Sequence, residues 1–262
     1  MPVIYTSTVS YVTEIVLNDP DNGNRLNYDF LIEFHTLLNK AISSENTRII
    51  VIRGAADIFS LGMDFRFILE KGDKISQDFL QPYADVMLSV RNSPKPVIAL
   101  VDGKVVAGGM GFVLASDIVI ATENASFALT ECLFGIIPAY VFPLLLERMP
   151  LKKARYLVIS SKTLDAEEAK NTGIVDEVFC SEKIQKNLKN YYQRLLYSKP
   201  ESLSLVKTYT DTLTDCKIKE TMQYAGKTLT DLLNNQKNQK AIRDFMQGEK
   251  MPWSLTYKKR KI

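Results

Sequence analysis

The stretch from Lys95 to Pro138 constrains the fold of this chain more than any other. It opens with a short apolar run, Lys95–Gly103, which predicts a buried strand, and two further short runs follow at Asp117–Thr122 and Ala125–Leu129. A segment with a helical pattern separates the first of these strands from the second. Strands that alternate with helices predict a parallel or mixed sheet with crossover helices, so the sequence favours an α/β fold.

The helix inside this stretch begins with Gly108, Gly109 and Gly111. Each glycine in a helix costs about 1 kcal/mol relative to alanine, so the cluster conflicts with the helical pattern. Such conflicts often mark a backbone that approaches a ligand, and exposed N–H groups at a helix start can stabilise negative charge. Further along, Glu131 is a lone carboxylate in an otherwise apolar run. Together the two features predict acid/base chemistry on an enolate.

Similar patterns predict further elements on both sides of this stretch. Two strands and one helix are expected at Val9–Asn18, Arg48–Gly54 and Tyr28–Ser43. A helical segment from Arg66 to Arg91 should be interrupted near Gly72 and Pro82. From Pro143 onward the patterns are mostly helical.

Composition excludes several classes of protein. The chain has 262 residues, enough for one domain with a large core, and its net charge of +3 gives no indication of a nucleic-acid partner. No apolar run approaches the length of about 20 residues that spans a bilayer, and the start of the chain lacks the pattern of a secretion signal. Three widely spaced cysteines, Cys132, Cys180 and Cys216, fit a reducing compartment. We therefore expect a cytoplasmic protein with no membrane partner.

The single histidine, His35, limits the chemistry further. It lies in a segment with helical apolar spacing, where it is most simply a structural residue. No C-x-x-C or H-E-x-x-H motif is present, and the glycines near residue 108 lack the lysine and Ser/Thr of a phosphate-binding P-loop. We therefore expect no metal site, no Ser–His–Asp triad and no nucleotide loop.

Four segments in order resemble the crotonase, or enoyl-CoA hydratase/isomerase, superfamily. They are Ile15–Asn27, Arg48–Phe65, Lys95–Glu131 and Thr163–Phe179. The resemblance implies a spiral of ββα units in residues 1–195 and a helical C-terminal region in residues 196–262 through which the subunits trimerise. The expected assembly is a homotrimer or a dimer of trimers.

The same resemblance implies an oxyanion hole and one catalytic carboxylate. In this family two backbone N–H groups bind the thioester oxygen and stabilise an enolate, and they map onto Met63 and Gly108. Hydratases of the family carry two catalytic glutamates, of which the second maps onto Glu131 and the first onto Gly111, so this chain lacks one. One carboxylate can still return the C2 proton to C4, which isomerises a double bond, or to a C3 hydroxyl, which removes water. Apolar neighbours should raise the pKa of Glu131; those expected are Phe127, Leu129, Leu133 and Phe134.

The core motif is most similar to a dehydratase branch of polyketide assembly lines. Those enzymes convert 3-hydroxy-3-methylglutaryl on an acyl carrier protein to 3-methylglutaconyl. The implied partner is therefore an acyl carrier protein, and the only cofactor is the phosphopantetheine of that protein or of coenzyme A. Alternatives are a double-bond isomerase or hydratase of fatty-acid metabolism, or a non-catalytic acyl-thioester scaffold. Further substrate-binding candidates are Asp64, also expected to cap the next helix, Tyr83, also a candidate proton relay, Gly109 and Tyr140.

Overall fold

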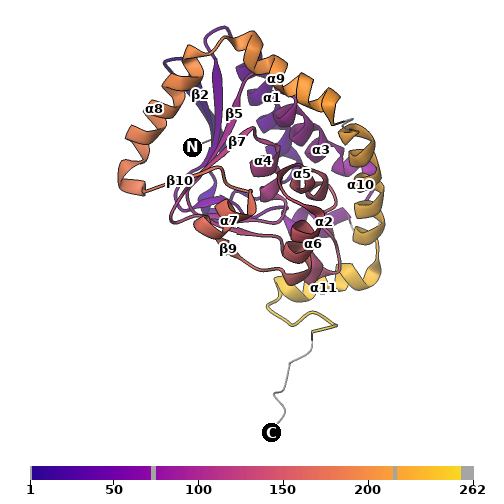
Figure 1. Ribbon diagram of the computed structural model, residues 1–262. Helices are drawn as coiled ribbons and strands as arrows, with labels where there is room; N and C mark the ends of the chain where they lie inside the picture. Colours follow the sequence, from indigo (N-terminus) through magenta and orange to yellow (C-terminus); the bar gives the residue numbers. More distant parts are fainter. Residues whose placement is uncertain (1, 72–74, 215–216, 255–262) are drawn as a thin grey trace.

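Two β-sheets form the framework of the molecule (Figure 1). The structure is a computed structural model that describes residues 2–71, 75–214 and 217–254, so Cys216 lies outside the described residues. In sheet order, the larger sheet contains β1 (Ile4–Val9), β2 (Val12–Leu17), β3 (Ile49–Gly54), β5 (Val97–Val101), β7 (Ile118–Thr122) and β10 (Glu177–Phe179). The smaller sheet contains β4 (Ile58–Ser60), β6 (Lys104–Val106), β8 (Ser126–Ala128) and β9 (Leu164–Asp165).

Three consecutive strand pairs give the chain a repeating ββα organisation. In the pairs β3–β4, β5–β6 and β7–β8, the first strand joins the larger sheet, the second joins the smaller sheet, and a helix follows. Strands β2, β3, β5, β7 and β10 pair in parallel, as do β4, β6 and β8, whereas β1 and β9 pair with their neighbours in antiparallel fashion. The predicted α/β fold built from ββα units is confirmed.

Helices surround the sheets and fill the C-terminal part of the chain. They are α1 (Tyr28–Ser43), α2 (Phe65–Lys71), α3 (Gln77–Arg91), α4 (Gly109–Ala115), α5 (Val141–Arg148), α6 (Leu151–Ser160), α7 (Ala166–Thr172), α8 (Ile184–Tyr197), α9 (Pro200–Leu213), α10 (Ile218–Leu233) and α11 (Gln236–Met246). The predicted boundary at residue 195 falls near the end of α8, and a helical C-terminal region follows it. Helix α10 packs against α3, and α11 packs against α2.

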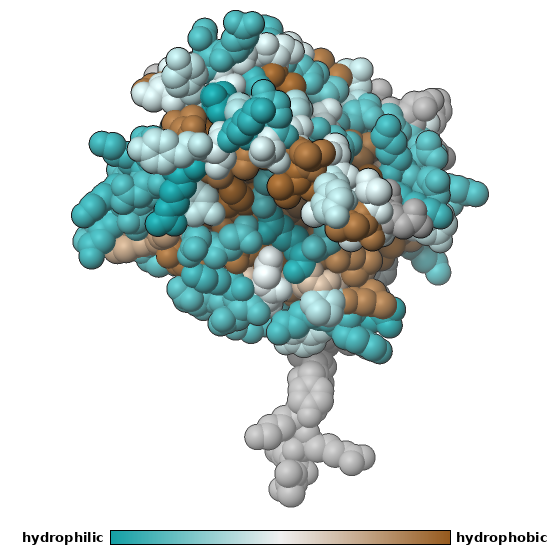
Figure 2. Space-filling view, turned by 45° about the horizontal axis from the view of Figure 1, so that its top comes forward, coloured by the Kyte–Doolittle hydropathy of each residue, from teal (hydrophilic) through white to brown (hydrophobic). Residues whose placement is uncertain are grey.

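The central strands of the larger sheet are buried on both faces. On β3 the alternate residues Ile50 and Ile52 join the main core, whereas Ile49 and Val51 join a second cluster covered by Leu188 of α8. This alternation follows from the two-residue period of a strand, and burial on both faces explains why the sequence of β3 is apolar throughout. At the surface, apolar side chains lie among polar ones on the face that Figure 2 shows.

The structure corrects two of the predicted elements. The strand expected at Val9–Asn18 is shorter and spans Val12–Leu17 (β2), because Ser10 and Tyr11 adopt positive φ angles and form the turn that joins β1 to β2. Helix α3 continues through Pro82, where an interruption was predicted, since packing against α1, α4 and α10 holds the helix together despite the missing N–H. The other expected break is present, because α2 ends at Lys71, and Gly72 itself lies outside the described residues.

Candidate active site

Two backbone loops bring the Met63 and Gly108 amides close together. Gly62, which follows β4, has a φ of 83°, and Ala107, which follows β6, has a φ of 49°. Positive φ is rare for a residue with a Cβ, so Ala107 adopts a strained conformation of the kind that clusters at functional sites. A Cβ on Gly108 would lie 3.6 Å from the Met63 nitrogen, and a Cβ on Gly62 would lie 3.0 Å from the Gly108 nitrogen.

Both amides keep their hydrogens available to a ligand. Leu26 forms an isolated β-bridge with this loop, in which its N–H donates to the Gly62 carbonyl and its carbonyl accepts from the Asp64 N–H. The Met63 N–H takes no part in this pairing. Gly108 precedes the first residue of α4, where N–H groups have no partner within the helix. Among the described residues, neither the Met63 nor the Gly108 N–H donates a hydrogen bond to another group. The pair therefore has the arrangement of an oxyanion hole.

Glu131 is a buried carboxylate that faces the same pocket. It begins a short 3-10 helix (Glu131–Phe134) that follows β8, and only 7% of the residue is exposed. Its Oε2 has no hydrogen-bond partner among the described residues. Burial raises the pKa of Glu131 to about 7, and the backbone of Glu131 and Thr130 only partly offsets this effect. A carboxylate with a pKa near neutrality suits a group that both takes and returns a proton.

The apolar surroundings of Glu131 differ in one respect from the prediction. Phe127 and Leu129 are buried, and Phe134 lines the pocket itself, as expected. Leu133 is largely exposed and contributes little to the burial of the carboxylate, because the short helix turns its side chain outward. Burial of the carboxylate therefore raises the pKa of Glu131, and not every apolar neighbour in the sequence is itself buried.

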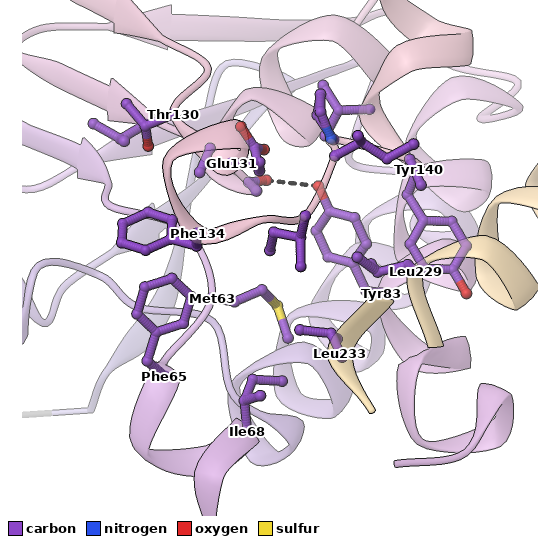
Figure 3. A pocket seen from close by; sticks show the side chains of 18 of the residues that line it. Met63, Phe65, Ile68, Tyr83, Thr130, Glu131, Phe134, Tyr140, Leu229 and Leu233 are labelled. Carbon is purple, nitrogen blue, oxygen red and sulfur yellow. Dashed lines mark hydrogen bonds between the residues drawn. The ribbon is translucent and has the colours of Figure 1, made fainter. Parts of the chain in front are cut away.

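The pocket has a volume of about 230 Å³ and is lined mainly by apolar side chains (Figure 3). Phe65 and Phe134 meet edge to face at 4.9 Å between ring centroids, and Phe245 of α11 contacts Phe134 at the same distance. Leu229 and Leu233 of α10 also line the pocket. The C-terminal helices therefore complete a cavity whose chemical groups come from the ββα core.

Tyr83 and Tyr140, the two tyrosines among the expected substrate-binding residues, both line this pocket. The Tyr83 hydroxyl donates a hydrogen bond to the carbonyl oxygen of Gly108 at 2.7 Å. Burial, together with Glu131 and Tyr140, raises the pKa of Tyr83 well above its ordinary value. The Tyr140 hydroxyl lies beside Gly226 of α10, where a Cβ would approach it to 2.4 Å, and it has no hydrogen-bond partner among the described residues.

Asp64 and Gly109 lie outside the pocket wall and have structural contacts instead. The Asp64 carboxylate accepts a hydrogen bond from the Arg66 backbone N–H at 3.0 Å and pairs with the Arg66 side chain at 2.8 Å, which fits the expected capping of α2. A Cβ on Gly109 would lie 2.6 Å from the Ser60 carbonyl oxygen, so glycine permits close packing of two backbones at this position.

Arg25 is a pocket residue that the sequence patterns did not single out. It is the one cationic residue among the described residues that line the cavity, and it is half-buried. A single arginine in a turn-rich segment has no periodic signal, and only the fold brings it near Leu61 and Met63. Its position inside the matching segment Ile15–Asn27 was the one available sign.

Within 2–71, 75–214 and 217–254, no group of three or more His, Cys, Asp or Glu residues could hold a metal ion. In the same ranges, no helix has both the length and the apolar character needed to cross a bilayer.

Comparison with known proteins identifies the family. The enoyl-CoA hydratase/isomerase family model matches residues 7–256. The bacillaene synthase dehydratase PksH of Bacillus subtilis is 30% identical over 254 residues, which cover 96% of this chain and 95% of PksH. Carnitinyl-CoA dehydratase of Escherichia coli K12 is 29% identical over 215 residues, which cover 81% of this chain and 82% of that enzyme.

Solved structures agree with this assignment. The crystal structure of a Bacillus subtilis protein provisionally named as the polyketide biosynthesis enoyl-CoA hydratase PksH superposes with a TM-score of 0.88 at 28% identity, covering 96% of this chain and 99% of that one. An enoyl-CoA hydratase from Bacillus halodurans, at 19% identity and a TM-score of 0.86, shares the fold over 92% of this chain and 99% of its own. The chain therefore belongs to the enoyl-CoA hydratase/isomerase family.

Proposed function

We propose that this protein is a hydro-lyase that removes water from a 3-hydroxyacyl thioester. The proposed substrate is 3-hydroxy-3-methylglutaryl on an acyl carrier protein, and the product is the 3-methylglutaconyl thioester. The observation that carries the proposal is one buried carboxylate, Glu131, that shares a pocket with the free amides of Met63 and Gly108. The relatives named as dehydratases support the same direction of reaction.

The proposed reaction begins at the carbon next to the thioester. The Glu131 carboxylate takes the C2 proton, and negative charge moves to the thioester oxygen, where the Met63 and Gly108 amides stabilise it. One such donor contributes about 3–4 kcal/mol to the stability of an oxyanion transition state. Glu131, now a carboxylic acid, gives the same proton to the C3 hydroxyl as the C3–O bond breaks, so that water and a conjugated thioester leave.

The chain has no second carboxylate for this site because residue 111 is glycine. Among the described lining residues, Glu131 is the only acidic one. Removal of the C2 proton and its return to the hydroxyl on one face of the acyl chain needs no other acid. A double-bond isomerase also needs one carboxylate, which makes it the second candidate function.

We propose that Arg25 supplies the positive charge for the distal carboxylate of the substrate. A carboxylate in an apolar cavity requires a cation or several hydrogen-bond donors, and Arg25 is the one cation among the described lining residues. Arg25→Gln should raise the KM for 3-hydroxy-3-methylglutaryl-pantetheine about 10-fold or more. The KM for 3-hydroxy-3-methylbutyryl-pantetheine, which lacks that carboxylate, should stay nearly unchanged. An equal rise for both thioesters would contradict this role.

The carrier of the substrate is also part of the proposal. The phosphopantetheine of an acyl carrier protein, or of coenzyme A, would hold the thioester and enter where the exposed Phe245 borders the pocket. No cofactor besides this carrier is required by the proton transfers described above. Free Cys132 and Cys180 fit a reducing compartment, and we propose a cytoplasmic location.

A mass measurement on the carrier protein tests the function. Wild-type enzyme with 3-hydroxy-3-methylglutaryl-carrier protein should shift the acyl mass by the loss of one water. Glu131→Gln should abolish the shift, because an amide cannot take the C2 proton. If the wild type removes no water but isomerises a 3-enoyl thioester, the isomerase is the correct function. If the carrier protein is converted equally with Glu131→Gln, the carboxylate is not the catalytic base. If the wild type converts neither thioester, the scaffold alternative gains support.

A further inference from the structure

The Tyr83 hydroxyl occupies the space into which a side chain at position 111 would project. Gly111 lies in α4, and all of its neighbours in that helix are buried. A Cβ on Gly111 would lie 2.1 Å from the Tyr83 hydroxyl oxygen and 2.6 Å from the sulfur of Met87, and both of these side chains come from α3. Because real Cβ contacts are never this short, the phenol fills the space into which any side chain at position 111 would project.

The single proton of the phenol is already used within the protein. Tyr83 donates it to the Gly108 carbonyl oxygen at 2.7 Å, and the same oxygen accepts the Gly111 N–H at 3.1 Å. Figure 3 shows the Tyr83 ring inside the pocket, with its hydroxyl directed toward the side of the cavity where Glu131 lies. A phenol has one donor and can also accept, so what Tyr83 offers to a ligand in the pocket is an acceptor oxygen.

We propose that Tyr83 is a substrate-positioning residue whose hydroxyl oxygen accepts a hydrogen bond from the 3-hydroxyl of the acyl group. This inference rests on the proposed dehydratase function. When the O–H of the substrate points at Tyr83, the lone pairs of the leaving oxygen turn toward the acid form of Glu131. The acyl group of a thioester without a 3-hydroxyl leaves this acceptor unsatisfied. The Gly111–Tyr83 pair therefore favours 3-hydroxyacyl groups in a site with one carboxylate.

This role differs from a proton relay and from a purely structural one. A relay would require the phenol to release the proton that it shares with Gly108, whereas a positioning residue keeps that bond throughout the reaction. In a purely structural role, Tyr83 would hold the first turn of α4 and the Gly108 amide in place. Loss of the phenol would then slow every reaction that forms an enolate. Water loss and enolate formation, measured separately, distinguish action at the 3-hydroxyl from the structural role.

Two thioesters that differ by one hydroxyl provide the test. Water loss is measured with 3-hydroxy-3-methylglutaryl-pantetheine. Formation of the enolate alone is measured as deuterium uptake at C2 of 3-methylglutaryl-pantetheine in D2O. Tyr83→Phe should slow water loss about 10- to 100-fold, the effect of one hydrogen bond to a buried group, and leave deuterium uptake within about twofold of wild type.

The outcomes separate failure of this inference from failure of the proposed function. An equal fall of both reactions in Tyr83→Phe would overturn the inference in favour of structural support of the oxyanion loop. An unchanged rate of water loss would overturn it as well, because Tyr83 would then make no contact with the hydroxyl. If wild-type enzyme takes up deuterium but removes no water, the proposed function fails, and this inference fails with it. Glu131→Gln is the control that should lose both reactions.

The shared volume has an independent test that requires no substrate. Gly111→Ala should lower the melting temperature strongly in the presence of Tyr83, because its Cβ meets the hydroxyl oxygen. The double variant with Gly111→Ala and Tyr83→Phe should have a melting temperature that falls by less than the sum of the two single decreases. The reason is that Tyr83→Phe removes the hydroxyl oxygen, which is the atom closest to the new Cβ. Additive losses would show that the two residues do not compete for this space.

Discussion

At the scale of single residues, burial would suit Glu131 to the proposed proton transfer. Only the ionised carboxylate can take a proton from C2, and the pKa of Glu131 is raised to about 7 because the pocket desolvates it. We expect kcat/KM for water loss to rise with pH through an apparent pKa near 7 and to level off above it. A profile measured from pH 5 to 9 checks this. A rate that is flat down to pH 5 would contradict a buried, raised base.

The same burial of Glu131 should lower the free energy of unfolding at high pH. Its pKa is 4.5 in an ordinary environment and about 7 in the fold, so the neutral form stabilises the protein at low pH and this contribution is lost as the pH rises from 4.5 to 7. The shift corresponds to on the order of 3 kcal/mol. Glu131→Gln should therefore increase the free energy of unfolding by about that amount at pH 8, and by less than about 1 kcal/mol at pH 5.

Urea denaturation at the two pH values measures the effect. The matched control is Glu45→Gln, since Glu45 is an exposed carboxylate in the loop after α1. A Glu131→Gln variant that is less stable than wild type at pH 8 would mean that the carboxylate is stabilised inside the fold. The combination of higher stability and lost activity is typical of an active-site residue.

Residue patterns singled out the polar groups of the candidate site more readily than the side chains that line it. The glycines near residue 108 and the lone carboxylate at Glu131 conflict with local preference, and such conflicts are visible in a sequence. Arg25 conflicts with no local preference, so nothing in the sequence around it marks it as a pocket residue. The space that Gly111 leaves for Tyr83 exists only once α3 and α4 are packed together. Both features depend on contacts between distant segments, which periodicity does not encode.

At the scale of elements, length and burial decided which predictions held. Helix α1 has the predicted bounds Tyr28–Ser43, because its apolar stripe is long and the Asn27 side chain caps its first turn. The short strands β4, β6 and β9 were not predicted, since their two or three residues carry no period, whereas the equally short β8 lies in the longer apolar run Ala125–Leu129. The strands β4 and β6 nevertheless position the candidate site, because the loops that carry the Met63 and Gly108 amides follow them.

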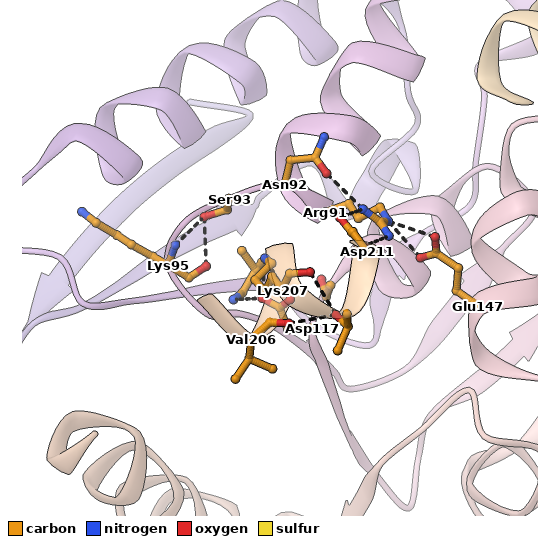
Figure 4. Close-up of polar contacts among 12 residues, drawn as sticks. Arg91, Asn92, Ser93, Lys95, Asp117, Glu147, Val206, Lys207 and Asp211 are labelled. Carbon is orange, nitrogen blue, oxygen red and sulfur yellow. Dashed lines mark hydrogen bonds and ion pairs between the residues drawn. The ribbon is translucent and has the colours of Figure 1, made fainter. Parts of the chain in front are cut away.

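A charged cluster joins three helices on the side of α9 that faces the body of the molecule. Arg91 of α3 pairs with Glu147 of α5 at 2.9 Å and with Asp211 of α9 at 2.7 Å (Figure 4). Its side chain is 14% exposed, whereas those of its two partners are partly exposed. Lys207 of α9 also pairs with Asp117, at 2.9 Å. Helix α9 is therefore held to the core by ion pairs.

Removal of Arg91 should destabilise the fold. Arg91→Met leaves two carboxylates without their shared cation, and we expect a loss of about 1–3 kcal/mol in the free energy of unfolding. Lys170→Met is the matched control, because its pair with Glu177 at 3.1 Å is exposed and should contribute less than about 1 kcal/mol. Urea midpoints with unchanged slopes give both values. Equal losses for the two variants would contradict a structural role for the cluster.

At the scale of the whole molecule, α9 has its charged side inward and its apolar side outward. Lys207 and Asp211 contact the core, whereas Leu205, Tyr209 and Leu213 are each more than half exposed. An amphipathic helix on a monomer normally has the opposite arrangement. Contiguous exposed apolar side chains usually mark an interaction surface. The expected trimer would bury this face against other copies of the chain.

Leu205→Glu combined with Tyr209→Glu should dissociate that assembly, because two carboxylates per subunit would lie in an apolar contact. Light scattering should then give the mass of a single chain, while Val9→Glu, at an exposed apolar residue of β1, should leave the assembly intact. A wild-type protein that is already monomeric would contradict the prediction.

The dissociated variant should still remove water within about threefold of the wild-type rate, because Glu131, Met63 and Gly108 all come from one chain. A complete loss of activity would mean instead that a neighbouring subunit completes the pocket.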